Sequence, residues 1–267
     1  MTLILALRQE PDQRLDLGPL VPHLLDGKSA SEIAAIELQT TRERRTVGDI
    51  FNVSGGGVEA IRFEGGSTRF DNLGHGLRSG EIHLDGDCGH AAGRAMSGGR
   101  LVVSGDAGPF AGSALSGGLL EIKGAAGDFL GAPLDGEMEG MTGGLVLVRG
   151  SAGCRAGDRM RRGTIVIEGS AGDYPGSRII AGTLIALRGG GLLPGYLMRR
   201  GSIVLGSAPD LAPTFVDCGA HRLTFAAVFS HFLSRDSKDA ADLLAQRLRR
   251  FMGDMAALGK GEILFPI

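Results

Sequence analysis

The sequence has few of the residues from which disulfide frameworks and metal sites are built. Its three cysteines, Cys88, Cys154 and Cys218, lie far apart and form no Cys-x-x-Cys pair. They therefore indicate neither a disulfide framework nor a metal site, and small reduced core residues are the simpler interpretation. The six histidines show no ligand spacing such as His-x-His or HExxH. We expect no metal site in this chain.

Long apolar runs and an excess of one charge are absent as well. No run approaches the ~20 apolar residues of a membrane span, and the apolar run Leu3–Leu7 is too short for a signal peptide. The formal net charge is −2, so no global basic field favours nucleic acid. We expect a cytoplasmic chain that binds neither membranes nor nucleic acid.

Known catalytic motifs are missing too. The chain has no Gly-x-Ser-x-Gly nucleophile motif and no paired carboxylates of the glycosidase kind. The fragment DGKS (residues 26–29) is not a phosphate loop, because Pro22 stands where the first glycine is required. We expect no catalytic residues.

Glycine, in contrast, is abundant and regularly spaced. The chain has 46 glycines in 267 residues, and between about residues 60 and 206 they recur with a period of nineteen. An insertion of seven residues near Asp135–Met141 interrupts the period once. One series is Gly74, Gly93, Gly112, Gly131 and, after the insertion, Gly157, Gly176 and Gly195. A fixed short period indicates one structural unit stacked repeatedly along an axis.

Apolar residues follow the same period. Each repeat has two apolar residues in alternation, which predicts a short strand with one buried face. The pairs are Ile61/Phe63, Ile82/Leu84, Leu101/Val103, Leu120/Ile122, Val146/Val148, Ile165/Ile167, Leu184/Ala186 and Ile203/Leu205. A second apolar column is Leu77, Met96, Leu115, Leu134, Met160, Ile179 and Met198, and a third, of small residues, is Cys88, Ala107, Ala126, Ala152, Ala171 and Gly190.

These columns predict the fold. A unit of nineteen residues has no room for a helix of ten residues, and its three glycines would weaken one. The chain must therefore turn back on itself in each repeat, with glycine supplying the positive φ of the corners. Successive strands then lie parallel, about 4.8 Å apart. The sequence predicts an all-β-dominated right-handed parallel β-helix of seven to eight coils. Right-handed winding is favoured because the six-residue sub-period of left-handed coils is absent.

Three regions are expected. Residues 1–58 form an N-terminal cap, with strands at Leu3–Leu7 and Ile36–Leu38 and a capping box at Ser29–Glu32 that opens a short helix. Residues 59–206 form the β-helix. Residues 207–267 form a connector and amphipathic helices.

Two helices are predicted in the C-terminal region. Phe225, Val228, Phe229 and Phe232 fall at helical spacing, either as core against the β-helix or as a partner surface. A longer helix is expected from about Ser237, and its apolar positions are Leu244, Leu248, Phe251 and Met255.

The middle residue of each predicted strand points away from the interior. In the early repeats it is Arg62, His83 and Glu121, with Val102 as the exception. In the later repeats it is Leu147, Val166, Ile185 and Val204. A continuous apolar stripe on an outer face is expected to be covered, either by the chain's own C-terminal helix or by another subunit. These four residues are therefore the candidate partner interface.

Basic residues gather beside that stripe. A pair of adjacent arginines recurs as a second pair two repeats later, and two further arginines occupy equivalent positions in successive repeats. The group is Arg159, Arg161, Arg162, Arg178, Arg199 and Arg200, called here the arginine flank. It is expected either to hold a polyanion or an acidic partner, or to be an ordinary surface network.

The repeated motif also carries a resemblance. GDAGPFAG, GAAGDFLG, GSAGCRAG and GSAGDYPG resemble the β-helix shared by the C-terminal domain of glutamate synthase large subunits and the C subunit of formylmethanofuran dehydrogenases. The leader LDGKSASEIAAIEL…VGDIFNVSG is similar to that C subunit. The resemblance covers about residues 20–205. The arginine-rich composition and residues 207–267 favour the bacterial form, from the formyltransferase/hydrolase complex of methylotrophs.

The resemblance implies a non-catalytic scaffold within a hetero-oligomeric complex of several different subunits. Such a complex passes a formyl group from formyl-tetrahydromethanopterin to a methanofuran-type carrier and releases formate. Its active sites and its metal belong to other subunits, so this chain itself binds no cofactor. The carrier's polyglutamate-like tail would give the arginine flank an anionic ligand.

Two other functions stay open at this point. One is an autonomous β-helix enzyme, such as a polysaccharide lyase or an acyltransferase, which needs a convergent cluster of carboxylates, lysines or histidines that the columns do not show. The other is a subunit of a glutamate synthase-like amidotransferase, which the identity of the neighbouring partner would distinguish.

Overall fold

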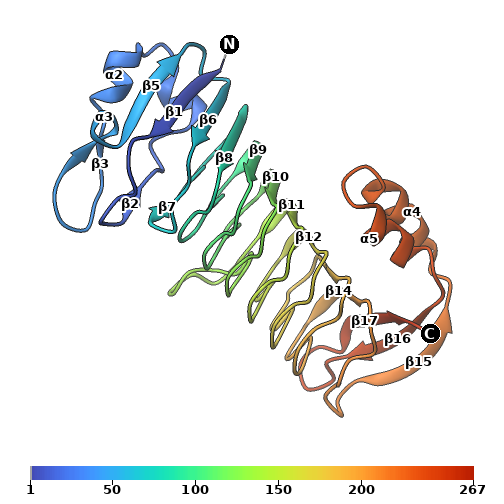
Figure 1. Cartoon of the computed structure of the whole chain (residues 1–267). Helices are drawn as coiled ribbons and strands as arrows, with labels where there is room; N and C mark the ends of the chain where they lie inside the picture. The colour runs from blue at the N-terminus through green and yellow to red at the C-terminus, as the bar shows by residue number, and fades with distance from the viewer. Residues whose placement is uncertain (1) are drawn as a thin grey trace.

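The computed structural model describes residues 2–267. Its body is a ladder of parallel strands stacked along the length of the molecule (Figure 1). In chain order these strands are β6 (Ala60–Glu64), β8 (Glu81–Asp85), β9 (Ser97–Val103), β10 (Gly117–Ile122), β11 (Thr142–Val148), β12 (Arg162–Ile167), β13 (Thr183–Ala186) and β14 (Arg200–Leu205).

The strand pairing follows the glycine period. Ile82 of β8 pairs with Leu101 of β9, and Leu101 pairs with Leu120 of β10, in steps of nineteen residues. Leu120 pairs with Val146 of β11 across a step of twenty-six, so the insertion lies outside the sheet. A second parallel ladder runs through the small column from Cys88 to Gly190. The two ladders confirm the predicted strands and the repeat that places them.

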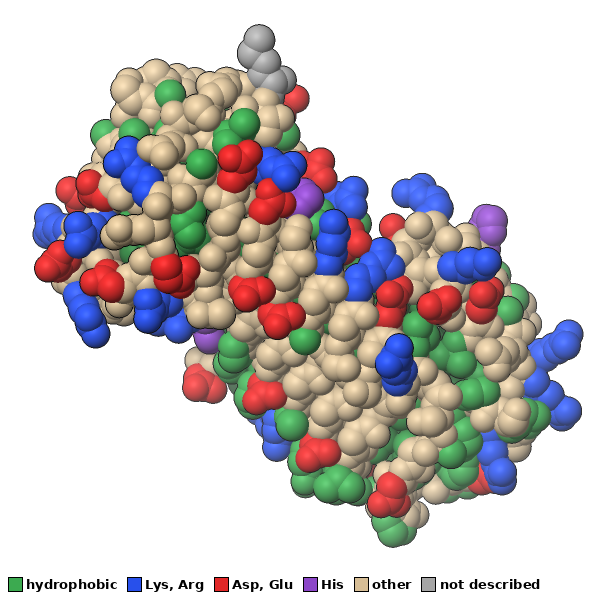
Figure 2. Space-filling view, in the orientation of Figure 1, with side chains coloured by type: hydrophobic (Ala, Val, Ile, Leu, Met, Phe, Trp, Pro, Cys, Tyr) green, Lys and Arg blue, Asp and Glu red, His purple; other side chains and the backbone are tan. Residues whose placement is uncertain are grey.

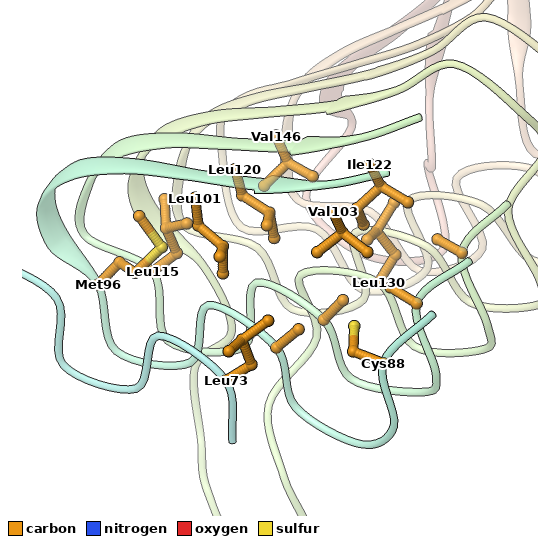
Figure 3. Packing of buried hydrophobic residues seen from close by; sticks show 14 of the residues in the cluster. Leu73, Cys88, Met96, Leu101, Val103, Leu115, Leu120, Ile122, Leu130 and Val146 are labelled. Atoms are coloured by element: carbon orange, nitrogen blue, oxygen red, sulfur yellow. The ribbon is translucent and has the colours of Figure 1, made fainter. Parts of the chain in front are cut away.

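The core lies between these two ladders. Strand side chains such as Leu101, Leu120 and Val146 face Cys88 of the second ladder, and Leu73, which precedes that ladder in the chain, lies on the same side as Cys88 (Figure 3). The prediction that Leu134 belongs to the second apolar column of the core is wrong. Leu134 is only half-buried, and Met141 is the buried residue at that position of the repeat. Met141 aligns with its neighbours through the backbone: the Thr142 amide, next to it, donates to the carbonyl of Leu115, and the Met141 carbonyl accepts from the amide of Arg161. The insertion therefore precedes Met141.

The corners of the repeat use more than glycine. Gly112 has a φ of 69°, and a Cβ there would lie 3.1 Å from Val146. Two residues before it, Phe110 has a φ of 60°, and its counterpart Phe129 has a φ of 61°. The prediction that glycine supplies the positive φ is thus incomplete. An outward-pointing side chain tolerates this conformation where the rest of the corner fixes it.

The N-terminal residues extend the ladder beyond β6. β1 (Leu3–Leu7) pairs in parallel with β6 and antiparallel with β5 (Phe51–Gly55). The predicted capping box at Ser29 and Glu32 is present at the start of α2. The predicted strand at Ile36–Leu38 is shorter by one residue. The remaining elements here are β2 (Leu15–Asp16), α1 (Pro22–Leu25), α2 (Ala30–Ala34), β3 (Glu37–Leu38), β4 (Arg45–Thr46), α3 (Val47–Ile50) and β7 (Phe70–Asp71).

The C-terminal region is only partly helical. β15 (Val216–His221) is followed by α4 (Thr224–Leu233) and α5 (Lys238–Leu244), and then by β16 (Leu248–Gly253) and β17 (Lys260–Pro266). The prediction of a long helix from Ser237 is wrong. The helix α5 ends at Leu244, and the residues Leu248 and Phe251 lie in the strand β16. Strand pairing accounts for the difference: β17 pairs in parallel with β14 and antiparallel with β16, which pairs with β15. A bare β14 edge would leave backbone donors and acceptors unpaired.

Within residues 2–267, the sheet has thirteen strands in the order β15-β16-β17-β14-β13-β12-β11-β10-β9-β8-β6-β1-β5. Two small sheets, β2-β7 and β3-β4, flank its N-terminal end. The structure is therefore mostly β, with one long and largely parallel sheet and two C-terminal helices. Among the described residues, none of the helices has the length and apolar character needed to cross a bilayer.

Candidate functional surfaces

The predicted apolar stripe is present and continuous. Leu147, Val166, Ile185 and Val204 pair in register along β11 to β14. Each is at most 1% exposed. They pack with residues of α4 and α5, namely Ala226, Leu233, Ala240, Leu243 and Leu244. The chain's own helices therefore cover the stripe, and the prediction that these four residues meet another subunit is corrected by their burial.

A polar cluster borders this covered area. Arg100 and Arg149 each donate to Glu121 at 2.9 Å, and Arg149 also donates to Glu168 at 2.7 Å. Glu168 accepts a further bond of 2.8 Å from the hydroxyl of Ser237, the N-cap residue of α5. The cluster thus joins β9, β10 and the ends of β11 and β12 to the start of α5.

Glu121 is held ionised in this cluster. Burial removes water from its carboxylate and by itself raises the pKa, but the hydrogen bonds and positive charges of Arg149 and Arg100 outweigh that effect. The net pKa of Glu121 is lowered. The sequence showed Glu121 as an outward residue but gave no sign of its partners, which lie in other repeats.

The outer side of α4 remains exposed. Phe225 is 40% exposed, Val228 69% and Phe232 59%. The interpretation of these residues as core is wrong for all three, because Ala226 and Leu233 are the α4 residues buried against the sheet. A groove of about 640 Å³ lies along this side, lined by the three residues together with Thr164 and Phe229.

The arginine flank divides into residues with and without an acidic partner. Arg178 is paired with the buried carboxylate of Asp158, which raises the pKa of the guanidinium. Arg161 is paired with Glu139. Arg159 donates to the backbone carbonyl of Glu137. The other three, Arg162, Arg199 and Arg200, make no ion pair with any described residue.

The insertion contributes two acidic side chains that pair with arginines. Glu137 pairs with Arg94 at 2.5 Å, and the hydrogen bond from Arg94 lowers the pKa of its carboxyl. Glu139, two residues on, reaches Arg161. The insertion therefore folds over the basic side of the ladder and neutralises part of it.

Two small cavities meet at Arg159 and Arg178. One, of about 330 Å³, is lined by Met138, Arg159, Arg178, Ile180, Leu197, Arg199 and Ala257. The other, of about 280 Å³, lies between the insertion and the stacked rings of Phe110 and Phe129, whose centroids are 4.8 Å apart. Sequence analysis missed these two phenylalanines, although their spacing of nineteen residues placed them in one column. The structure thus brings Arg159, Arg178 and Arg199 together and leaves Arg162 and Arg200 at strand starts.

Several residues of types common in active sites have structural roles here: two aspartates accept hydrogen bonds from backbone amides, and one cysteine is buried in the core. Asp87 accepts a bond from the Asp106 amide at 2.8 Å, and Asp106 accepts one from the Ala125 amide at 2.7 Å. Burial raises the pKa of the Cys88 thiol to about 12, so it is uncharged at neutral pH. Within residues 2–267, no group of three or more potential metal ligands comes together.

Comparison with known proteins identifies the family. No family model matches the chain. It is, however, 41% identical over 262 residues to the C subunit of the formyltransferase/hydrolase complex Fhc of Methylorubrum extorquens, and the match covers 98% of each chain. The chain belongs to the family of Fhc C subunits.

A solved structure agrees with this membership. A chain in the crystal structure of the formyltransferase/hydrolase complex FhcABCD from Methylorubrum extorquens, determined with methylofuran, superposes on this fold with a TM-score of 0.95. The two are 40% identical, and 99% of each chain is covered. The likeness to an Fhc C subunit therefore extends through residues 207–267, which the glycine motif does not reach, and the predicted family is confirmed.

Proposed function

We propose that this chain is the C subunit of a formyltransferase/hydrolase complex and acts as its non-catalytic scaffold. The likeness to the Fhc C subunit over nearly the full length carries this proposal. The use of aspartates and glycines for backbone geometry, repeat after repeat, supports a scaffold role. The paired ladders also support the finer fold prediction of a right-handed β-helix with seven to eight coils.

The complex would move a formyl group from formyl-tetrahydromethanopterin to a methanofuran-type carrier and release formate. Both reactions, and the metal of the hydrolase, would belong to the partner subunits. The presence of methylofuran in the similar complex supports this class of carrier. The partners would therefore be a formyltransferase subunit, a hydrolase subunit and the remaining subunits of the assembly.

The arginine flank is a proposed contact for the carrier's anionic tail. Arg159, Arg178 and Arg199 line one cavity, and the exposed Arg162 and Arg200, at the starts of β12 and β14, would add positive charge to this part of the molecule. Arg161 contributes less than the sequence suggested, since Glu139 already neutralises it. Reversing Arg161, Arg162, Arg199 and Arg200 to glutamate is expected to weaken retention of the carrier, whereas Arg42→Glu, in the N-terminal region, is not. Unchanged carrier content and assembly in the fourfold variant would refute this contact.

The proposed function is tested by purifying the tagged chain from its native cell. We expect formyltransferase and hydrolase subunits to co-elute and to be identified by mass spectrometry. Formyl transfer and hydrolysis should occur in the eluate and not with the isolated chain. A single, monodisperse chain that turns over a substrate would instead favour an autonomous enzyme, and co-elution with glutaminase and synthase subunits would favour an amidotransferase.

A further inference from the structure

α4 carries large apolar side chains that the rest of the chain leaves exposed. Seven of its ten residues are Phe, Ala, Val or Leu. A helix that is hydrophobic on every side is normally buried on every side. One side of α4 is buried through Ala226 and Leu233, but Phe225, Val228 and Phe232 face outward.

The exposed residues form one line along the helix. Their spacing of three and four residues places them on a single face, and the rings of Phe229 and Phe232 stack with centroids 5.8 Å apart. Thr164 of β12 closes the side of the groove toward the sheet. Hydrophobic side chains gather at this end of the molecule, and both basic and acidic side chains lie beside them (Figure 2). Aromatic residues in such a groove are typical anchors of protein interfaces.

An exposed arginine flanks α4 at each end, and Asp236 follows the second of them. α4 contains no acidic residue, and Arg222 and Arg235 lie just before and just after it, both exposed. Neither makes an ion pair with the described part of the chain. A matching surface therefore needs apolar side chains in its centre and carboxylates at its ends.

These observations argue against a second copy of this chain. A two-fold axis across α4 would bring Arg222 next to Arg235 of the other copy in the antiparallel arrangement, or next to Arg222 in the parallel one. Like charges would meet in both.

We propose that the groove of Phe225, Val228 and Phe232 docks an amphipathic helix of another subunit of the complex, with acidic residues at the ends of that helix. Such helix-in-groove contacts use apolar anchors three and four residues apart. The contact rests on the proposed membership of a formyltransferase/hydrolase complex. It lies on α4, whereas the arginine flank lies on the ladder and the insertion, so the two can be tested separately.

The test compares two double variants in the full chain, co-expressed with the other subunits. Val228→Glu/Phe232→Glu alters the groove, and Leu24→Glu/Leu192→Glu alters two leucines elsewhere that are also at least half exposed. We expect the groove variant to recover at least tenfold less of one partner subunit, and the control to match the wild type. Equal circular dichroism and urea midpoints for the isolated chains would show that folding is unaffected.

The outcomes separate the two proposals. If the wild type recovers formyltransferase and hydrolase subunits and the groove variant recovers them equally, the docking site is wrong and the proposed function stands. If the wild type recovers neither, the proposed function fails. An isolated wild type that dimerises, or that sediments with phosphatidylglycerol vesicles, while the groove variant does neither, would make a second copy or a lipid surface the occupant and overturn the proposal.

A charge reversal tests the chemistry of the partner. Arg222→Glu/Arg235→Glu keeps the apolar groove and reverses its ends. We expect weaker recovery of the same partner subunit and a smaller loss of binding when salt is raised. Recovery equal to the wild type at all salt concentrations would overturn the acidic ends of the docked helix.

Discussion

The outer face of one sheet differs between its two halves. Along β6, β8 and β10 the middle residues are Arg62, His83 and Glu121, and only Val102 of β9 is apolar there. Along β11 to β14 all the middle residues are apolar and buried. The backbone pairing is the same parallel ladder in both halves. The side chains of one column therefore decide whether this face carries ion pairs in water or supports a second layer of helices.

The two halves meet at Glu121 and Arg149. On one side, Arg62 pairs with Asp85 at 2.6 Å while half exposed. On the other side, α4 and α5 lie on the stripe, and Ser237 links α5 to Glu168. This comparison leads to four predictions, ordered from the largest expected effect to the smallest.

Ile185→Asp would place an unpaired charge beneath α4 and α5. Ile185 is 0% exposed within the covered stripe, and a buried charge without a partner costs several kcal/mol. We expect loss of at least about 4 kcal/mol of unfolding free energy, or detachment of residues 222–247 seen as rapid proteolysis.

His83→Asp is the matched control in the same column. His83 lies in the open half, where its ring contacts Ser104. A surface change of this kind is expected to shift stability by less than about 1 kcal/mol. Equal losses for Ile185→Asp and His83→Asp in urea unfolding would contradict the difference between the two halves.

Glu121→Gln tests the boundary cluster. The charged bonds to Arg100 and Arg149 are expected to contribute about 1–3 kcal/mol at pH 7. Because the folded pKa of Glu121 is lowered, this contribution is present above the ordinary pKa of 4.5 and is lost as pH falls through the folded value. The stability gap between wild type and variant should therefore shrink below about pH 4.5. A stability gap that grows on acidification would refute the conclusion that Arg100 and Arg149 lower the pKa of Glu121.

Ser237→Ala tests how α5 is attached. Its hydroxyl caps the helix and bonds Glu168, and loss of an N-cap costs about 1 kcal/mol. Ser29→Ala, at the exposed cap of α2, should cost less, since Ser29 has no link to the sheet. Thermal unfolding of both variants measures the two losses of stability. A larger loss of stability for Ser29→Ala than for Ser237→Ala would argue against the stabilising link between Ser237 and Glu168.

Arg62→Ala should have the smallest effect. Its ion pair with Asp85 is in contact with water, and such pairs contribute about 0–1 kcal/mol. Raising the salt concentration should make wild type and variant equal in urea unfolding. A salt-independent loss above about 2 kcal/mol would show that the open half depends on this pair more than its exposure implies.

The repeat made much of this fold readable from sequence. Each strand appears once per nineteen residues with the same glycines. The glycine columns and the apolar columns therefore predicted the same strand positions independently. The insertion was located to within a few residues, and its only consequence for the core was that Met141 replaced Leu134. The apolar stripe was visible for the same reason, although its covering was not.

The C-terminal region lacks a repeat and was predicted less well. Leu248 and Phe251 fit a helix by spacing, but β16 forms there because β17 continues the ladder beside β14. A signal for β17 did exist: Gly261-Glu262-Ile263 repeats the Gly80-Glu81-Ile82 that opens β8. The partners of Glu121 and of the arginine flank lie 20 to 28 residues away in sequence, so only the folded chain reveals them.

Hydrogen exchange of the isolated chain and of the assembled complex would test the central claim most directly. The account predicts that amides of residues 164–167 and 183–186, beneath the C-terminal helices, are already protected in the isolated chain and do not change on assembly. It predicts new protection at residues 222–235. New protection confined to the strands of the stripe, with α4 unchanged, would contradict it.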